Sequence, residues 1–112
     1  MALTIREYLT ADGKSPFRAW LESLTVAVRA RIQARVLRFE MGNLGDHKAV
    51  GSGVWEARVM FGPGYRISFG KDGDAIIVLL VGGDKGSQAR DISRAHEFWG
   101  DDLEATRHGT AK

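Results

Sequence analysis

Three cationic residues lie in and just after an alternating segment in the middle of the chain. Arg58 and Arg66 flank a glycine-rich turn, and Lys85 follows the next apolar run. His47 and Lys48 precede the same segment, in a loop that leads into it. Converging cations bind phosphate oxygens and stabilise the extra charge of a pentavalent transition state. Because RNA supplies its own nucleophile, the 2′-hydroxyl, this set indicates phosphodiester cleavage by a base, an acid and cations without a metal ion.

The segment that carries the two arginines has the period-two pattern of β-strands. Its large apolar side chains share one predicted face: Trp55, Val59, Phe61, Tyr65, Ile67 and Phe69. The opposite predicted face mixes charged and apolar residues and is expected to be partly open: Glu56, Arg58, Met60, Arg66, Ser68, Ile77 and Leu79. If Phe61 and Tyr65 flank the turn, Arg58 opposes Ser68. An alternative stays open, in which Arg58 pairs with Glu56 and Arg66 is ordinary surface.

The remaining elements follow from spacing and capping residues. Leu3–Tyr8 predicts a strand, and Ser15 followed by Pro16 predicts the start of a short helix. Thr25 predicts the cap of a second helix that ends near Met41, and 42–48 reads as a loop. A central apolar strand after the Asp-Gly turn and a helix from about Ser87 to Trp99 complete the order β-α-α-β-β-β-α. This order predicts an α+β fold with a small, largely antiparallel sheet packed against an αα-hairpin.

Composition limits the classes of protein that fit. The chain has 112 residues and no cysteine, so we expect one domain over 1–99, a flexible tail over 100–112, and neither disulfides nor thiol catalysis. Its start lacks an apolar signal region and no stretch is long enough for a membrane span, so we expect a cytoplasmic protein. The three histidines are far apart, and the glycine-rich turns match no phosphate-binding or dinucleotide motif. We therefore expect neither a metal ion nor a cofactor.

Two stretches carry a resemblance to a known family: "GVWEARVMFGPGYRISF" and "DGDAIIVLLVGGDKGSQARDISRA". They resemble the addiction-module killer proteins of the RelE/ParE toxin superfamily, in its HigB-like and phage-derived Gp49-like branch. The resemblance extends from Tyr8 to Trp99, and the element order agrees with the fold of that family. It implies an RelE/ParE-like fold and the toxin component of a type II toxin–antitoxin system.

The resemblance also implies an activity and partners. RelE-type toxins are endoribonucleases that cleave mRNA on the ribosome and inhibit translation. A co-encoded antitoxin, usually a helix-turn-helix protein in this branch, would be the partner besides ribosome and mRNA. Arg66 matches a functional arginine of the RelE-type nucleases, and Lys85 falls near a second family cation. Arg58, Lys48, His47 or Lys85 are then candidates for the base and acid.

The chain departs from RelE at other functional positions. The RelE lysines before the turn align with about Ala57 and Val59, and a tyrosine of the terminal helix aligns near Arg90. The base and acid are therefore not identified. ParE-like relatives inhibit DNA gyrase without nuclease activity, so gyrase inhibition is the alternative function, and an inert binding module is a third.

A stripe of arginines on the second predicted helix is a further candidate surface. Arg31, Arg35 and Arg38 recur at helical spacing beside an apolar stripe. In a toxin of this family the stripe could bind ribosomal RNA or an acidic antitoxin segment. A solvated helix face explains the same pattern equally well.

Overall fold

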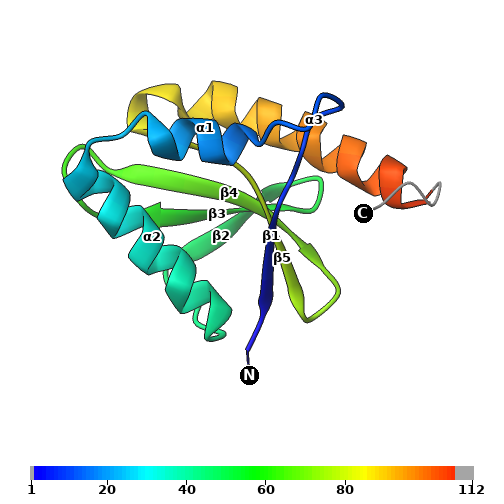
Figure 1. Ribbon diagram of the computed structural model, residues 1–112, viewed down its shortest axis with the longest axis horizontal. Coiled ribbons are helices and arrows are strands. Elements are labelled where there is room, and N and C mark those ends of the chain that lie inside the picture. Colours follow the sequence, from blue (N-terminus) through cyan, green and yellow to red (C-terminus); the bar gives the residue numbers. More distant parts are fainter. Residues whose placement is uncertain (1, 108–112) are drawn as a thin grey trace.

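A computed structural model describes residues 2–107. The elements follow one another as β1 (Thr4–Glu7), α1 (Pro16–Glu22), α2 (Val26–Glu40), β2 (His47–Gly51), β3 (Val54–Val59), β4 (Tyr65–Asp72), β5 (Ile76–Asp84), a 3₁₀ turn (Lys85–Ser87) and α3 (Gln88–Arg107). This is an α+β architecture, as predicted, and Figure 1 shows its twisted sheet with the helices around it. No helix within residues 2–107 is long and apolar enough to cross a membrane.

Five strands form a mixed sheet in the order β1-β5-β4-β3-β2. β1 runs parallel to β5, while β5, β4, β3 and β2 pair antiparallel in succession. The sequence prediction missed β2, because a loop was assigned to the residues before Val54. β2 is a short edge strand with a polar start, and it bends through Gly51, Ser52 and Gly53, which all have positive φ.

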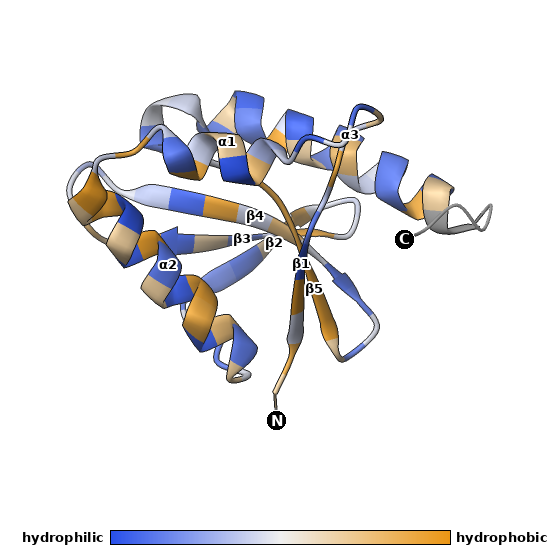
Figure 2. Ribbon diagram, in the orientation of Figure 1, coloured by the Kyte–Doolittle hydropathy of each residue, from blue (hydrophilic) through white to orange (hydrophobic). Residues whose placement is uncertain are grey.

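Two apolar layers cover the two faces of the sheet. On one face α1 and α2 contribute the core residues Phe17, Leu21, Ile32 and Phe39, which pack on β3, β4 and β5. On the other face α3 contributes Ala95 and Trp99, which pack on Val54, Val78, Leu80 and Val81. The strand β5 is therefore apolar along most of its length, as Figure 2 shows.

The helix starts were predicted correctly. The Ser15 side chain accepts a hydrogen bond from the Arg18 amide at 2.9 Å, with Pro16 in the first helical position. The Thr25 side chain accepts one from the Val28 amide at 3.4 Å. These caps fix the short connection between α1 and α2.

The β3–β4 register differs from the prediction by two residues. Val59, not Phe61, pairs with Tyr65, so Arg58 lies opposite Arg66 and Glu56 opposite Ser68. A shift of two residues leaves each side chain on its predicted face. It lengthens the turn to 60–64 and places Met60 in the connection rather than in the sheet.

Two further predictions are corrected on the α3 side of the sheet. Ile77 and Leu79 belong to the α1–α2 core and not to the face of Glu56. That face is also not open at Glu56 and Ser68, since both are buried.

The helix α3 does not end at Trp99 but continues to Arg107, and Asp102 within this extension is buried. Residues 108–112 of the expected tail lie outside the described residues.

Candidate functional site

A pocket of about 400 Å³ lies at the turn between β3 and β4. Arg58 from β3, Arg66 from β4 and Lys85 from the turn after β5 all line it. These are the three residues that the sequence predicted for catalysis. The structure therefore brings them to one concave place, although they are separated by up to 27 positions (85 − 58) in the chain.

Arg66 forms an ion pair with a buried carboxylate. Its Nη1 donates a hydrogen bond to Oε1 of Glu56 at 3.3 Å, and the Glu56 side chain is only 1% exposed. Gln88 at the start of α3 donates from Nε2 to both Glu56 oxygens, at 3.1 and 3.2 Å. Strands β3 and β4 and helix α3 thus fix the direction of one guanidinium. The buried Nε of Arg66 has no hydrogen-bond partner among the described residues.

Arg58 has a different and more exposed partner. Its Nε donates to Oδ2 of Asp46 at 3.1 Å, and its Nη2 donates to Oδ1 at 3.3 Å. The two side chains are 43% and 52% exposed, so solvent screens this pair and can replace it. The alternative that paired Arg58 with Glu56 and left Arg66 at the surface is therefore wrong, because Glu56 pairs with Arg66.

Lys85 is exposed and begins the 3₁₀ turn. The neighbouring Asp84 accepts a hydrogen bond from the Ser87 amide at 3.2 Å and so caps this turn. Lys85 itself forms no ion pair with any residue that the structure describes. Its ammonium group is free to bind an anion at the pocket.

The glycine-rich turn supplies the apolar wall of the pocket. Phe61 and Tyr65 line it, and both also pack against the α1–α2 core. The guanidinium of Arg31, which comes from α2, lies 4.2 Å from the centre of the Phe61 ring. Arg31 is therefore a fourth cation beside the pocket, consistent with its predicted place on an exposed stripe.

Arg35 does not belong to that exposed stripe. It is 7% exposed and donates to the carbonyl oxygens of Arg58 (2.6 Å), Asp46 (2.9 Å) and Leu44 (3.1 Å). Burial lowers the pKa of Arg35, and the charge of Arg38 lowers it further. The prediction that Arg35 contacts RNA is corrected, since its donors stabilise the 44–46 loop. Arg38 is exposed.

His47 and Lys48 begin β2 and do not line the pocket. The His47 ring faces the α1–α2 side, with its centre 5.5 Å from Trp55 and 6.3 Å from Phe69. Lys48 is exposed opposite Glu56 in the sheet. His47 is thus removed from the predicted cationic cluster, while Lys48 stays on its face.

Sequence reasoning missed the partners that organise the cluster. Asp46 was part of a presumed loop, and Gln88 was one polar residue among several at a helix start. The sequence analysis expected the face of Glu56 to be partly open, so it did not identify Glu56 as buried. Burial by α3 is a tertiary effect that leaves no local pattern.

The pocket can bind an anion, and Lys85 and Tyr65 are the lining residues whose side chains ordinarily transfer protons. Two guanidinium groups and one ammonium group can contact a phosphodiester from several directions. None of its described lining residues is a carboxylate or an imidazole. Within residues 2–107, no three His, Cys, Asp or Glu side chains cluster as metal ligands.

Comparison with known proteins found a relative that matches most of the chain. A protein of Haemophilus influenzae, described only as uncharacterized, is 38% identical over 96 residues, which span 85% of this chain and 91% of the relative. The chain belongs to the family of this protein. No protein-family model matches the chain. The two sequences match over most of their lengths.

Proposed function

We propose that this protein is the toxin of a type II toxin–antitoxin system and a ribosome-dependent mRNA endoribonuclease of the RelE/ParE superfamily. The observation that carries the proposal is the convergence of Arg58, Arg66 and Lys85 on one pocket. The two stretches that resemble the superfamily include the β3–β4 hairpin and the β5–α3 junction, which form the walls of that pocket. The resemblance and the geometry thus concern the same part of the molecule.

The cations would act on the phosphate and not on a proton. Arg66, fixed by Glu56, would bind a non-bridging oxygen and stabilise the charge that develops as the 2′-hydroxyl attacks phosphorus and the bond to the 5′-oxygen of the next nucleotide breaks, which leaves a 2′,3′-cyclic phosphate and a 5′-hydroxyl. Arg58 and Lys85 would bind further oxygens of the same group. Removing one such preorganised donor commonly lowers a rate by about 100- to 1000-fold. Proton transfer is assigned to no residue of the pocket.

Gyrase inhibition is the second candidate function. The observation in its favour is the lack of a carboxylate or imidazole among the described lining residues of the pocket. A protein that inhibits by binding needs no base or acid. In either case we propose that the protein acts in the cytoplasm and is neutralised by a co-encoded antitoxin of the helix-turn-helix class.

Primer extension on a reporter mRNA in a purified translation reaction tests the proposal. The wild-type protein is compared with Lys85→Ala and Arg66→Ala, and with Lys14→Ala as a control that removes an equal charge from an exposed loop residue outside the pocket. Lys85→Ala is the sharper variant, because Lys85 is exposed and its loss should not unfold the protein. We expect cuts that need ribosomes, persist in Lys14→Ala and weaken at least tenfold in Lys85→Ala.

One result would contradict the nuclease activity, and another would contradict its placement in the cationic pocket. Intact mRNA with active wild-type protein would exclude it, and supercoiling by purified gyrase would then be assayed. Equal cleavage by the wild type and by folded Lys85→Ala and Arg66→Ala would show that the cationic pocket is not the site.

A further inference from the structure

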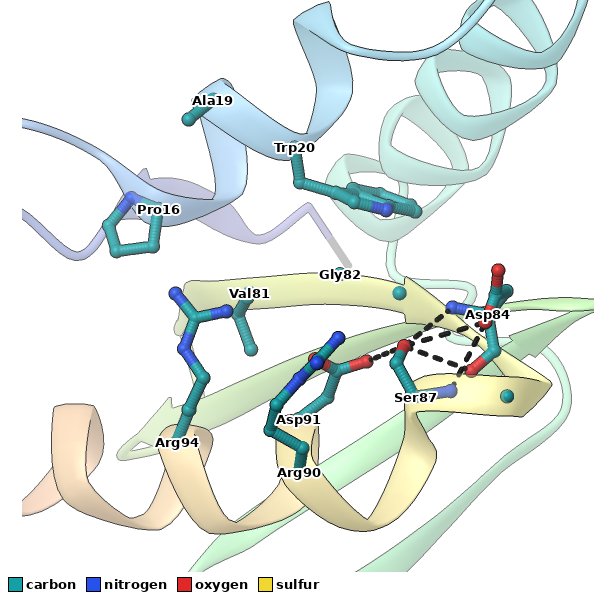
Figure 3. A pocket seen from close by; sticks show the side chains of 12 residues that line it. Pro16, Ala19, Trp20, Val81, Gly82, Asp84, Ser87, Arg90, Asp91 and Arg94 are labelled. Atoms are coloured by element: carbon teal, nitrogen blue, oxygen red, sulfur yellow. Dashed lines mark hydrogen bonds between the residues drawn. The ribbon is translucent and has the colours of Figure 1, made fainter.

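A second and larger cavity, of about 650 Å³, lies on the other side of the β5–α3 junction. Figure 3 shows it between α1 above and the first turns of α3 below, with the end of β5 as its floor. None of the predicted site residues lines it. The loop 84–87 separates it from the cationic pocket, because Lys85 lines the first pocket and Asp84, Gly86 and Ser87 line the second.

An indole ring forms one wall of this cavity. Trp20 projects from α1 over Gly82, and a Cβ at Gly82 would lie only 2.1–2.5 Å from its ring carbons. Glycine is therefore required there for the ring to lie against the strand. Trp20 remains partly exposed, so the cavity offers an aromatic surface above a backbone floor.

Two arginines form the opposite rim. Arg90 and Arg94 are four residues apart on α3, so they lie on the same side of the helix, and both are exposed. Figure 3 shows both side chains rising from α3 into the space below α1. Neither forms an ion pair with any carboxylate in the described part of the chain. Arg94 contacts the Phe98 ring, with 5.4 Å between its guanidinium carbon and the ring centre.

The acidic residues of the cavity are already engaged. Ser87 donates its hydroxyl to the buried Asp91, whose carboxylate faces the strand at Gly83. Asp84 accepts the amide of Ser87. The carboxylates are thus turned to internal partners, whereas the guanidinium groups are available to a ligand. A rim of this kind favours an anion, and the indole favours a flat ring beside it.

We propose that this cavity binds a nucleotide unit, with the base against Trp20 and the phosphate on Arg90 and Arg94. An indole and paired arginines are the groups that bind a base and a phosphate in single-stranded nucleic acids. The unit could be a free nucleotide or part of an RNA chain that continues past Lys85 into the first pocket. The site does not depend on cleavage and goes beyond the proposed function.

Binding is measured with the full-length protein and without ribosomes. The probes are AMP and a fluorescent single-stranded RNA hexamer with 2′-O-methyl groups, which block cleavage. Arg90→Ala, Arg94→Ala, Trp20→Phe and Lys85→Ala are compared with the wild type, and Lys14→Ala, at an exposed residue that lines neither pocket, is the matched charge control. Circular dichroism confirms that each variant is folded. The two arginine variants keep the test valid if replacement of Trp20 disturbs the core.

The proposal predicts how salt dependence and affinity change in each variant. Each cavity arginine that contacts a phosphate should make the negative slope of log K against log salt steeper by about 0.7 for the hexamer. Its removal should weaken binding about tenfold. Lys14→Ala should leave the binding of both probes unchanged. Micromolar affinity for AMP that is weakened to the same extent in Arg90→Ala and Arg94→Ala would identify a free-nucleotide site. Binding of the hexamer without binding of AMP would identify a subsite for an RNA chain.

Other outcomes overturn the proposal. Equal affinity of the wild type, Arg90→Ala and Arg94→Ala for both probes would exclude the cavity as the site, and so would no binding of either probe. Loss of hexamer binding only in Lys85→Ala would assign RNA to the first pocket. Because no cleavage is scored, failure here is distinguishable from failure of the nuclease proposal.

Discussion

Arg58 and Arg66 lie directly opposite each other on β3 and β4, although both are cationic. Like charges in opposing positions of a sheet destabilise it. Each guanidinium is offset by its own carboxylate, Asp46 for Arg58 and Glu56 for Arg66. The Asp46 side chain is 52% exposed and the Glu56 side chain 1%, so the two pairs differ in what they contribute.

Glu56→Gln tests the buried pair. The amide keeps the shape of the side chain but removes the negative charge beneath Arg66, whose own side chain is 17% exposed. A buried charge that loses its partner is costly, so we expect the free energy of unfolding to fall by about 2–4 kcal/mol. Urea unfolding followed by circular dichroism measures it.

Asp46→Asn is the matched control for that variant. It removes the partner of Arg58 at the surface, and we expect a loss below about 1 kcal/mol. Equal losses in Glu56→Gln and Asp46→Asn would contradict the view that burial distinguishes the two pairs.

Arg35→Ala tests the structural role that replaces the predicted RNA contact. The substitution leaves the carbonyl oxygens of Leu44, Asp46 and Arg58 without their guanidinium donors. The Asp46 carbonyl keeps the Arg58 amide as a donor, and an acceptor left unpaired costs about 1–3 kcal/mol, so we expect a loss of about 1–3 kcal/mol in urea unfolding. Arg38→Ala on the exposed side of the same helix should change stability by less than about 0.5 kcal/mol. If the two variants unfold alike, Arg35 is not a structural residue.

Alternation in the sequence was enough to predict which face each β3–β4 residue occupies, but not which residues are paired. Face depends on the period of two, which a shift of two residues preserves. Pairing depends on the turn, and the turn includes Met60 and Phe61 as well as the three residues Gly-Pro-Gly. The cluster of Arg58, Arg66 and Lys85 could be predicted because face and strand order suffice for it.

The supports of the site could not be predicted in the same way. Gln88 reaches Glu56 only because α3 crosses the sheet at that point, and the two residues are 32 positions apart. Arg35 reads as part of an exposed stripe until the 44–46 loop folds over it. Long-range packing decides both cases, and a helical or strand period carries no information about it.

The surroundings of the Tyr8 hydroxyl lead us to expect that the folded protein loses stability at alkaline pH. Burial raises the pKa of Tyr8 above the ordinary value, as do the hydrogen bond that its hydroxyl donates to Asp101 at 2.5 Å and the charges of Asp101, Asp102 and Glu97. Below the unfolded-state pKa of about 10, both states keep the proton and Tyr8 adds no pH dependence. Above it, the unfolded state loses the proton first, so the stability contributed by Tyr8 falls as pH rises.

Urea unfolding between pH 8 and pH 11 checks this expectation in the wild type and in Tyr8→Phe. The variant loses one hydrogen bond and should be less stable at pH 8, by about 1 kcal/mol. Its stability should also decline less steeply above pH 10. Parallel curves for the two proteins would show that Tyr8 is not the group responsible.

Replacement of Asp102 tests whether α3 extends beyond Trp99, where the sequence analysis ended the helix. Asp102 is 6% exposed and accepts two hydrogen bonds from Arg6 of β1, at 3.0 Å from Nη1 and 2.9 Å from Nη2. The same contact raises the pKa of Arg6. A residue of a flexible tail could be replaced without cost, whereas this one links the last turns of α3 to the edge of the sheet. We therefore expect Asp102→Asn to lower the free energy of unfolding by about 1–3 kcal/mol, with Glu97→Gln, an exposed residue of the same helix, as the control. Equal stability of Asp102→Asn and the wild type would mean that residues beyond Trp99 do not contribute to the fold.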